Sequence, residues 1–235
     1  MFTVVNKQQV TTNMLRLTLH GEQLEHVTWQ PGCYVKLRVP NGAITKTRTY
    51  TVRSLDTQAK TMDIDFAIHR PAGPATSWAL NTKIGDSIEL RGPGNLRMDS
   101  TSGDWYLFVA DMSALPAAIS IIETLPPNAK GIAFFEVMSE EDKQDFTAPP
   151  GIKINWFIHP DPTARSPHQI NAIKSISPFE GTPNVFVAGE MSTIKEIKKY
   201  LNQEELYKDA FRYVSSYWKI GASEEVHKMV KRLGI

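Results

Sequence analysis

Arg48 and Tyr50 lie two positions apart in the segment Arg48-Thr49-Tyr50-Thr51. If this segment is a β-strand, both side chains are on one face and their Cα atoms are roughly 7 Å apart. A guanidinium binds a phosphate through two donors, and a tyrosine ring packs flat against an aromatic ligand. A planar ring joined to a pyrophosphate is a flavin dinucleotide, so the pair is a candidate flavin site. The alternative is an ordinary strand with a half-exposed tyrosine.

A second candidate segment begins at His69 and follows a run of alternating apolar and polar residues. Gly73 permits a tight backbone, Thr76 and Ser77 supply hydroxyl groups, and a short helix can begin at Ala75. The backbone amides at the start of a helix bind phosphate oxygens. The alternative is a capped helix that covers the end of the N-terminal fold, with His69 in a structural role.

Basic side chains are concentrated in one stretch of this nearly neutral protein. No acidic residue lies between Glu25 and Asp56, whereas five basic residues do: Lys36, Arg38, Lys46, Arg48 and Arg53. Such a patch suits an anionic ligand, and the alternative is a solvated basic face.

Other kinds of site are not indicated. The single Cys33 excludes an intramolecular disulfide and a cysteine-based zinc or iron–sulfur site. The patterns Gly-x-Ser-x-Gly and His-Glu-x-x-His are absent, so neither a serine hydrolase nor a zinc protease is predicted, and we expect no metal site. The carboxylates of Asp63, Asp65 and residues 140–142 are expected to be solvated.

Strand-like runs fill the chain up to about residue 99. They are short, several alternate apolar and polar side chains, and turns containing Gly or Pro separate them. The six runs are Thr3–Val10, Met14–His20, Tyr34–Val39, Thr47–Arg53, Met62–Ala67 and Ser87–Arg91. Six such strands predict an antiparallel β-barrel domain over residues 1–99.

From about residue 100 the pattern changes to continuous apolar runs, which are typical of strands buried on both faces. These runs are Trp105–Ala110, Ile132–Val137, Ile154–Ile158, Val185–Ala188 and Phe211–Val214. Helices are expected to begin near Ser113, Ser192 and Ser223, and the last one carries an apolar stripe of Val226, Met229, Val230 and Leu233. Region 140–183, rich in Pro and acidic residues, is expected to be mostly loop. The alternation predicts a parallel-sheet α/β domain of the nucleotide-binding type over residues 100–235.

The composition is that of an ordinary globular protein without a strong charge. Lys and Arg number 26 against 25 Asp and Glu, which excludes a whole-molecule basic field for nucleic acid. The most apolar stretch is interrupted by Asp111 and Pro116, so it does not predict a membrane span. The first residues show no targeting pattern. We therefore expect a cytoplasmic monomer without nucleic-acid or membrane partners.

Short motifs follow one another along the whole chain. In the first half they are the Arg-x-Tyr-Thr stretch at Arg48, His69 with Gly-Pro-Ala-x-x-Trp-Ala from Gly73, and turns at Gly85-Asp86 and Gly92-Pro93-Gly94. In the second half they are Ala110–Ala117, Val187–Glu190 and Ser216–Gly221 with Glu224. This ordered set resembles the siderophore-interacting proteins, a branch of the ferredoxin-reductase-like flavoproteins.

The resemblance implies an FAD-dependent ferric-siderophore reductase. Its cofactor-binding residues would be Arg48, Thr49, Tyr50, Thr51, His69, Gly73, Ala75, Thr76, Ser77, Asp111 and Ser113. Arg48 would contact the FAD phosphates, Tyr50 would lie along the isoalloxazine ring, and the segment from His69 would hold the pyrophosphate and adenosine side. Asp111 and Ser113 would border the flavin from the α/β domain, which would receive NAD(P)H.

The implied chemistry is the transfer of electrons from a two-electron donor to a one-electron acceptor, for which flavin is the adaptor. Reduction to the ferrous state weakens the grip of the siderophore, and iron is released. Ferric catecholates are anionic, so Lys46, Arg53 and Lys219 are the candidate substrate-binding residues. The alternatives are a flavoprotein reductase fed by ferredoxin, one with another acceptor, and a non-redox carrier of ferric chelates.

The chain departs from the family pattern where the donor is concerned. Met112 and Ser113 replace the usual Glu and Thr, and Ser216 replaces a Gly. The Gly-Thr-Gly loop that usually cradles the nicotinamide dinucleotide in the wider superfamily is absent. The sequence therefore leaves open the donor-site residues and the choice between NADH and NADPH.

Overall fold

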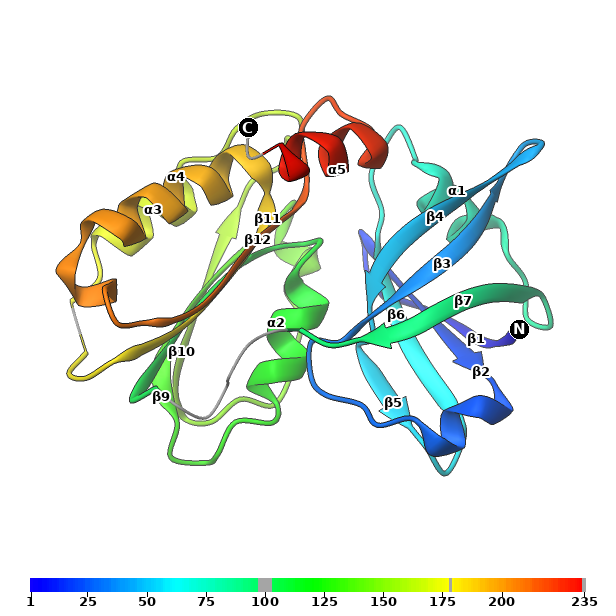
Figure 1. Ribbon diagram of the computed structural model, residues 1–235, viewed down its shortest axis with the longest axis horizontal. Helices are drawn as coiled ribbons and strands as arrows, with labels where there is room; N and C mark the ends of the chain where they lie inside the picture. Colours follow the sequence, from blue (N-terminus) through cyan, green and yellow to red (C-terminus); the bar gives the residue numbers. More distant parts are fainter. Residues whose placement is uncertain (97–102, 178, 234–235) are drawn as a thin grey trace. The chain divides into compact units, whose positions relative to one another are not determined.

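The computed structural model describes residues 1–96, 103–177 and 179–233. The chain divides into two compact units. One comprises Met1–Leu96 together with Ile119–Ile121, and the other comprises the rest of the described chain. Each unit is built on one sheet (Figure 1). Within the described ranges, no helix combines the length and the apolar character needed to cross a bilayer.

A seven-stranded antiparallel sheet forms the first unit as a half-barrel. Its strands are β1 (Phe2–Thr11), β2 (Met14–His20), β3 (Tyr34–Asn41), β4 (Ile44–Thr51), β5 (Ser54–Asp56), β6 (Thr61–Ala67) and β7 (Ser87–Gly94). In space they follow the order β4-β3-β7-β1-β2-β6-β5. A 3-10 helix, η1 (Glu22–His26), follows β2, and helix α1 (Pro74–Asn81) lies between β6 and β7.

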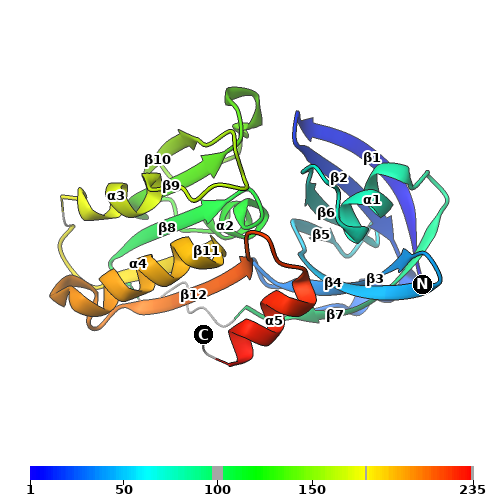
Figure 2. The same ribbon diagram turned by 90° about the horizontal axis from the view of Figure 1, so that it is seen from above.

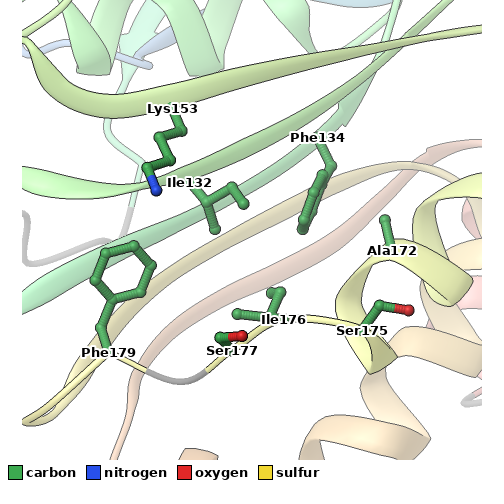
Figure 3. Close-up of a pocket in the computed structure, with 8 residues that line it drawn as sticks. All are labelled: Ile132, Phe134, Lys153, Ala172, Ser175, Ile176, Ser177 and Phe179. Carbon is green, nitrogen blue, oxygen red and sulfur yellow. The ribbon is translucent and has the colours of Figure 1, made fainter.

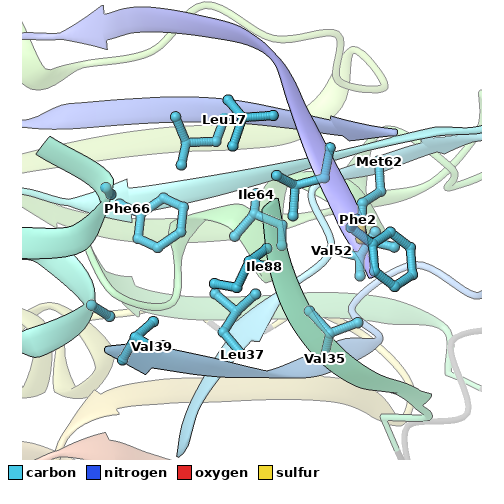
Figure 4. Close-up of a cluster of buried hydrophobic side chains, with 14 of the residues drawn as sticks. Phe2, Leu17, Val35, Leu37, Val39, Val52, Met62, Ile64, Phe66 and Ile88 are labelled. Carbon is cyan, nitrogen blue, oxygen red and sulfur yellow. The ribbon is translucent and has the colours of Figure 1, made fainter. Parts of the chain in front are cut away.

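Alternating side chains build the core of this unit. Leu15, Leu17 and Leu19 of β2 are buried, while the polar residues between them are half-exposed, as the sequence pattern predicts. Leu37 of β3 and Phe66 of β6 meet them in the same apolar cluster (Figure 4). The hydrophobic effect thus selects one face of each strand and fixes the register.

The sequence predicts six strands here, and the structure adds β5. This strand has only three residues, so no alternation can reveal it, and it pairs with β6 at the edge of the sheet.

The expectation of solvated carboxylates is wrong for Asp65. Its side chain is buried and accepts hydrogen bonds from Arg16 Nε at 2.6 Å and Nη2 at 2.8 Å. The neighbouring Asp63 accepts from the hydroxyls of Thr18 and Ser54. The pairing of β2 with β6 places Arg16 opposite Asp65, and single-strand patterns contain no information on such cross-strand partners.

A five-stranded parallel sheet forms the second unit, in the order β10-β9-β8-β11-β12. Its strands are β8 (Trp105–Asp111), β9 (Lys130–Val137), β10 (Gly151–Ile158), β11 (Pro183–Glu190) and β12 (Phe211–Trp218). The helices are α2 (Leu115–Ile122), α3 (His168–Lys174), α4 (Met191–Gln203) and α5 (Glu224–Arg232), with 3-10 turns η2 (Glu140–Asp142) and η3 (Glu205–Tyr207). This is the predicted α/β architecture.

Helices cover both faces of this sheet. Figures 1 and 2 show α3 and α4 on one face and α2 on the other. Trp105, Leu107 and Val109 of β8 belong to the same cluster as Ile173 of α3 and Ile197 of α4. Because both faces are covered, every residue of β11 is buried, which explains the continuous apolar runs.

Four details differ from the sequence-based expectations. Helix α3 lies in the region predicted to be mostly loop, β12 extends to Trp218, and Asp142 is buried rather than solvated. Helix α5 buries His227, whereas Val226 and Met229 of the predicted apolar stripe are exposed, at 43% and 56%, and Val230 is half-buried. Helical spacing identifies the faces of a helix, but it does not determine which face packs.

Candidate functional site

Strand β4 places Arg48 and Tyr50 on the face that also builds the core. Their partners across the ladder are Leu37 and Val35 of β3, both fully buried. Arg48 is itself only 9% exposed, and its Nη1 donates to the carbonyl oxygen of Thr47 at 3.0 Å. The two side chains that could bind a phosphate and an aromatic ring therefore share one face of one strand.

Phe66 links this strand to helix α1. The ring of Tyr50 packs on Phe66 with centroids 4.5 Å apart and an interplanar angle of 37°. On α1, the Trp78 ring lies 6.0 Å from the same phenylalanine. The two segments that the sequence singles out are thus joined through one buried aromatic side chain.

The remaining candidates of this region are dispersed. Lys46 is half-buried and, two residues before Arg48, points to the same face of β4. Thr49 is exposed and points to the opposite face. Thr51 is buried at the end of the strand. Arg53 follows β4, and its backbone N–H donates to the Asp63 carbonyl at 2.8 Å.

Helix α1 begins without a side-chain cap. Gly73 is the N-cap in an extended conformation, none of its first-turn residues is acidic, and Pro74 takes the first helical position. The first amides of a helix have no intrahelical acceptor, and proline has no N–H, so Ala75 and Thr76 carry the first N–H groups of the helix itself. This end has the polarity of an anion site.

The side chains around this end fall into two groups. His69 is exposed, and a Cβ atom at Gly73 would lie 3.9 Å from its ring. Ser77 is half-buried, and its backbone N–H donates to the Gly73 carbonyl at 2.8 Å. The Thr76 hydroxyl instead turns inward toward the carbonyl of Ala67, at 3.4 Å, so Thr76 offers its amide rather than its hydroxyl.

In the second unit, Asp111 ends β8 and is engaged on both oxygens. Oδ1 accepts from the Ser113 amide at 2.9 Å and from its hydroxyl at 2.6 Å. Oδ2 accepts from the indole N–H of Trp218 at 2.7 Å. Burial raises the pKa of Asp111, and the hydrogen bonds from Ser113 and Trp218 act in the opposite direction.

Gly189 and Glu190 end β11 beside this carboxylate. Gly189 has φ +148°, and a Cβ there would lie 2.6 Å from Asp111 Oδ2. Glu190 is the N-cap of α4, and its Oε2 accepts from the amides of Ser192 at 2.6 Å and Thr193 at 3.2 Å. Its Oε1 accepts from the Ile220 amide at 3.2 Å.

Polar contacts hold α5 against the end of β12. Nε2 of the buried His227 lies 2.9 Å from the Ser216 hydroxyl, and Lys231 Nζ donates to Ser215 Oγ at 2.7 Å. Burial, with Lys231 and Lys228 nearby, lowers the pKa of His227. Lys219 is half-buried directly after the strand.

One further carboxylate at this edge of the sheet, that of Glu136, was not predicted from the sequence patterns. Glu136, near the end of β9, accepts a hydrogen bond from the Ser166 hydroxyl. Burial raises its pKa, and that hydrogen bond opposes the shift. The sequence places Glu136 near the carboxyl end of a predicted parallel strand, where ligands of such sheets bind. It does not reveal the hydrogen-bond partner of Glu136, which lies in a distant loop.

A partly open pocket of about 350 Å³ lies at the other end of the same sheet (Figure 3). It is lined by Ile132, Phe134, Lys153, Ala172, Ser175, Ile176, Ser177 and Phe179. The residues predicted to bind cofactor or substrate do not line it. In the described part of the chain, no group of three or more His, Cys, Asp or Glu is arranged to hold a metal ion.

Family models match both units. Residues 38–96 match the siderophore-interacting FAD-binding domain, and residues 103–221 match the siderophore-interacting protein model. The chain is also 33% identical to the ferric vibriobactin reductase of Vibrio cholerae, over 95% of this chain and 90% of that protein. The chain belongs to the siderophore-interacting protein family.

Solved structures share the fold of this family member. The siderophore-interacting protein SipS from Aeromonas hydrophila matches with a TM-score of 0.87 and 26% identity, over 99% of this chain and 96% of that one. A ferredoxin-NADP+ reductase from Plasmodium falciparum matches with a TM-score of 0.65 and 13% identity, over 86% and 91% of the two chains. The likeness to the ferredoxin-NADP+ reductase shows the fold alone. The predicted fold, an antiparallel β unit followed by a parallel-sheet α/β unit, is confirmed.

Proposed function

We propose that this protein is an FAD-dependent ferric-siderophore reductase. The observation that carries the proposal is the placement of Arg48 and Tyr50 on one face of β4, with Phe66 joining Tyr50 to Trp78 of α1, a helix whose start has no side-chain cap. It occurs in a chain whose curated relative is a ferric vibriobactin reductase.

Two features of the first unit fit FAD. The start of α1 lacks the acidic or hydroxyl cap that would compete with a phosphate, and Arg48 adds a donor pair for the same kind of group. Tyr50 offers an aromatic face that Phe66 holds from behind. His69 and Ser77 flank the helix start and would contact the pyrophosphate or the adenosine side.

When bound, FAD supplies the conversion between electron pairs and the single electrons that ferric iron accepts. The chain supplies position and charge: Arg48 and the first amides of α1 bind the phosphates, and Tyr50 orients the ring. We assign Lys46, Arg53 and Lys219 to attraction of the anionic ferric siderophore, because long-range charge raises the rate of encounter.

The electron donor, the cellular location and the oligomeric state remain predictions. The resemblance to the family implies NAD(P)H as the donor, with Asp111 and Ser113 bordering the flavin, and a reduced ferredoxin is the alternative. A cytoplasmic location and a monomeric state are likewise predictions from the sequence.

The proposal is tested by mixing the FAD-loaded, chemically reduced protein anaerobically with a ferric catecholate and a ferrous-iron trap. We expect the flavin bands to return while trapped ferrous iron accumulates. A protein that does not bind FAD, or whose reduced flavin is not reoxidised by the ferric chelate, would contradict the proposal and favour a carrier or another acceptor.

A further inference from the structure

None of the residues assigned to FAD or to the ferric siderophore lines the pocket of Figure 3. Ile132 and Phe134 contribute to its apolar wall, and because they lie two positions apart on β9 their side chains face the same side of the sheet. Asp111 and Glu136, in contrast, lie at the carboxyl ends of β8 and β9. The pocket is therefore a separate feature of the second unit.

The pocket forms where helix α3 ends. Near the start of α3, the ring of Phe157 on β10 stacks on that of His168, with centroids 5.7 Å apart. Four residues earlier, on the same face of β10, the side chain is Lys153. The helix ends at Lys174, and Ile176 of the following segment lines the pocket. The hollow is thus the part of this apolar face that lies beyond the last turn of the helix.

Contacts outside the pocket hold its other wall in place. The ring of Phe179 stacks on the fully buried Trp105, with centroids 5.1 Å apart and an interplanar angle of 27°. The indole N–H of Trp105 donates to the Gly181 carbonyl at 3.1 Å, and the Ile176 amide donates to the Ile173 carbonyl at 3.3 Å. These bonds do not involve a ligand, so the hollow exists before one binds.

Among the described residues that line the pocket, Lys153 alone is charged. It is the partner of Ile132 in the ladder between β9 and β10, so the two side chains share a face. Figure 3 shows its ammonium group turned toward Ile132 and Phe179. A carboxylate would form a charge-assisted hydrogen bond with this group. One cation beside an apolar hollow therefore favours a ligand with an apolar body and a single negative charge.

We infer that this pocket binds a small aromatic monocarboxylate, with its ring between Phe134 and Phe179 and its carboxylate on Lys153. A volume of about 350 Å³ lies in the lower part of the range of small-molecule sites, so one or two fused rings fit. Figure 3 shows the rings of Phe134 and Phe179 on opposite sides of the pocket, which favours a flat aromatic body over an alkyl chain. This second binding site does not rest on the proposed function.

The inference is tested with 2-naphthoate, added to isotopically labelled protein whose flavin site is filled with FAD. Amide chemical shifts report both the affinity and the place of binding. We expect shifts confined to the starts of β9 and β10 and to the segment after α3. The expected dissociation constant is about 0.1–1 mM, the range for a ligand of this size. Shifts that do not saturate, or that map to other elements, would overturn the inference.

Charge removal tests the role of Lys153. Lys153→Met keeps the length of the side chain and should weaken binding of 2-naphthoate about three- to tenfold, while the affinity for neutral 2-naphthamide stays the same. Lys83→Met removes an exposed lysine from the loop before β7 in the first unit and should change neither affinity. Equal losses for the acid and the amide, or an affinity for the acid equal to that of Lys83→Met, would contradict the inference.

Filling the hollow tests the place of binding. Figure 3 shows the methyl group of Ala172 on α3 at the pocket, and Ala172→Leu should abolish binding of both probes without altering the sheet. Persistent binding would place the probes elsewhere and overturn the inference. Octanoate has the same charge on an alkyl chain and should bind the wild-type protein more weakly than 2-naphthoate. Tighter binding of octanoate would reject the aromatic class, and this comparison needs no variant.

Discussion

Trp218 donates its indole N–H to Asp111 Oδ2 at 2.7 Å, and this bond joins the end of β12 to the end of β8 across the strand between them. Gly189 ends that middle strand, and a Cβ on it would lie 2.6 Å from the same oxygen. The glycine of the Val187–Glu190 motif is therefore required because the bond passes over it. A motif that resembles a cofactor contact is, in this unit, part of a hydrogen-bonded scaffold.

Gly189→Ala should lower the free energy of unfolding, because it combines a positive φ with a clash against Asp111. The φ contribution alone is about 1–3 kcal/mol. Gly42→Ala is the control, since Gly42 also has a positive φ, +62°, but a Cβ at that position would have no other atom within 4 Å. Urea unfolding should show a larger loss for Gly189→Ala, and equal losses would show that the clash is relieved without cost.

Asp111→Asn should break the bond to Trp218. Both carboxylate oxygens accept, and an amide that keeps one acceptor turns its NH2 toward the other donor, at a cost of about 1–3 kcal/mol. Trp218→Phe removes that donor, so the double variant should be more stable than the sum of the single losses predicts. Strictly additive losses in urea unfolding would mean that the two side chains are not coupled.

Acid should destabilise the protein partly through His227. Its pKa is lowered below the ordinary 6.5, so the unfolded chain binds a proton at a pH where the folded chain does not. The stability due to this neutral histidine is therefore present above about pH 6.5 and is lost as the pH falls below it. His227→Gln should lose less stability than wild type between pH 7.5 and pH 5.5. Parallel pH dependences in urea unfolding would contradict this assignment.

Arg48→Ala should weaken FAD binding about 10- to 100-fold, the range expected for a lost charged hydrogen bond. Arg91→Ala removes the same charge from a side chain that is 73% exposed on β7, and it should change the dissociation constant little. Flavin fluorescence titration measures both, with thermal melting to confirm folding. Equal affinities of the two variants would remove Arg48 from the site.

Lys219→Ala should slow the second-order reaction of the reduced protein with a ferric catecholate about two- to fivefold and flatten its dependence on salt. Lys208→Ala, a change at a 65% exposed lysine, is the matched control. A rate and a salt dependence that match the control would exclude Lys219 from substrate attraction.

Much of this fold could be predicted from periodicity. A strand buried on one face alternates apolar and polar residues, and a strand buried on both faces is continuously apolar. The sequence pattern does not show which side chains become partners across strands and loops. The burial of Asp65 depends on Arg16 in another strand, and the partner of Glu136 lies in a distant loop. The candidate site was predictable at Arg48 and Tyr50, where alternation within one strand is enough. It was not predictable that Thr76 turns its hydroxyl inward, that Asp111 accepts from the amide of Ser113, or that Glu190 caps helix α4.

The most direct test of the central claim is the stoichiometry of a single turnover. Protein loaded with FAD, reduced by a measured amount of dithionite and freed of excess reductant is mixed anaerobically with a ferric catecholate and a ferrous trap. The account predicts about two trapped ferrous ions for each FAD, formed as the flavin bands return. Flavin that stays reduced in the presence of the ferric chelate, with no trapped ferrous iron, would contradict it.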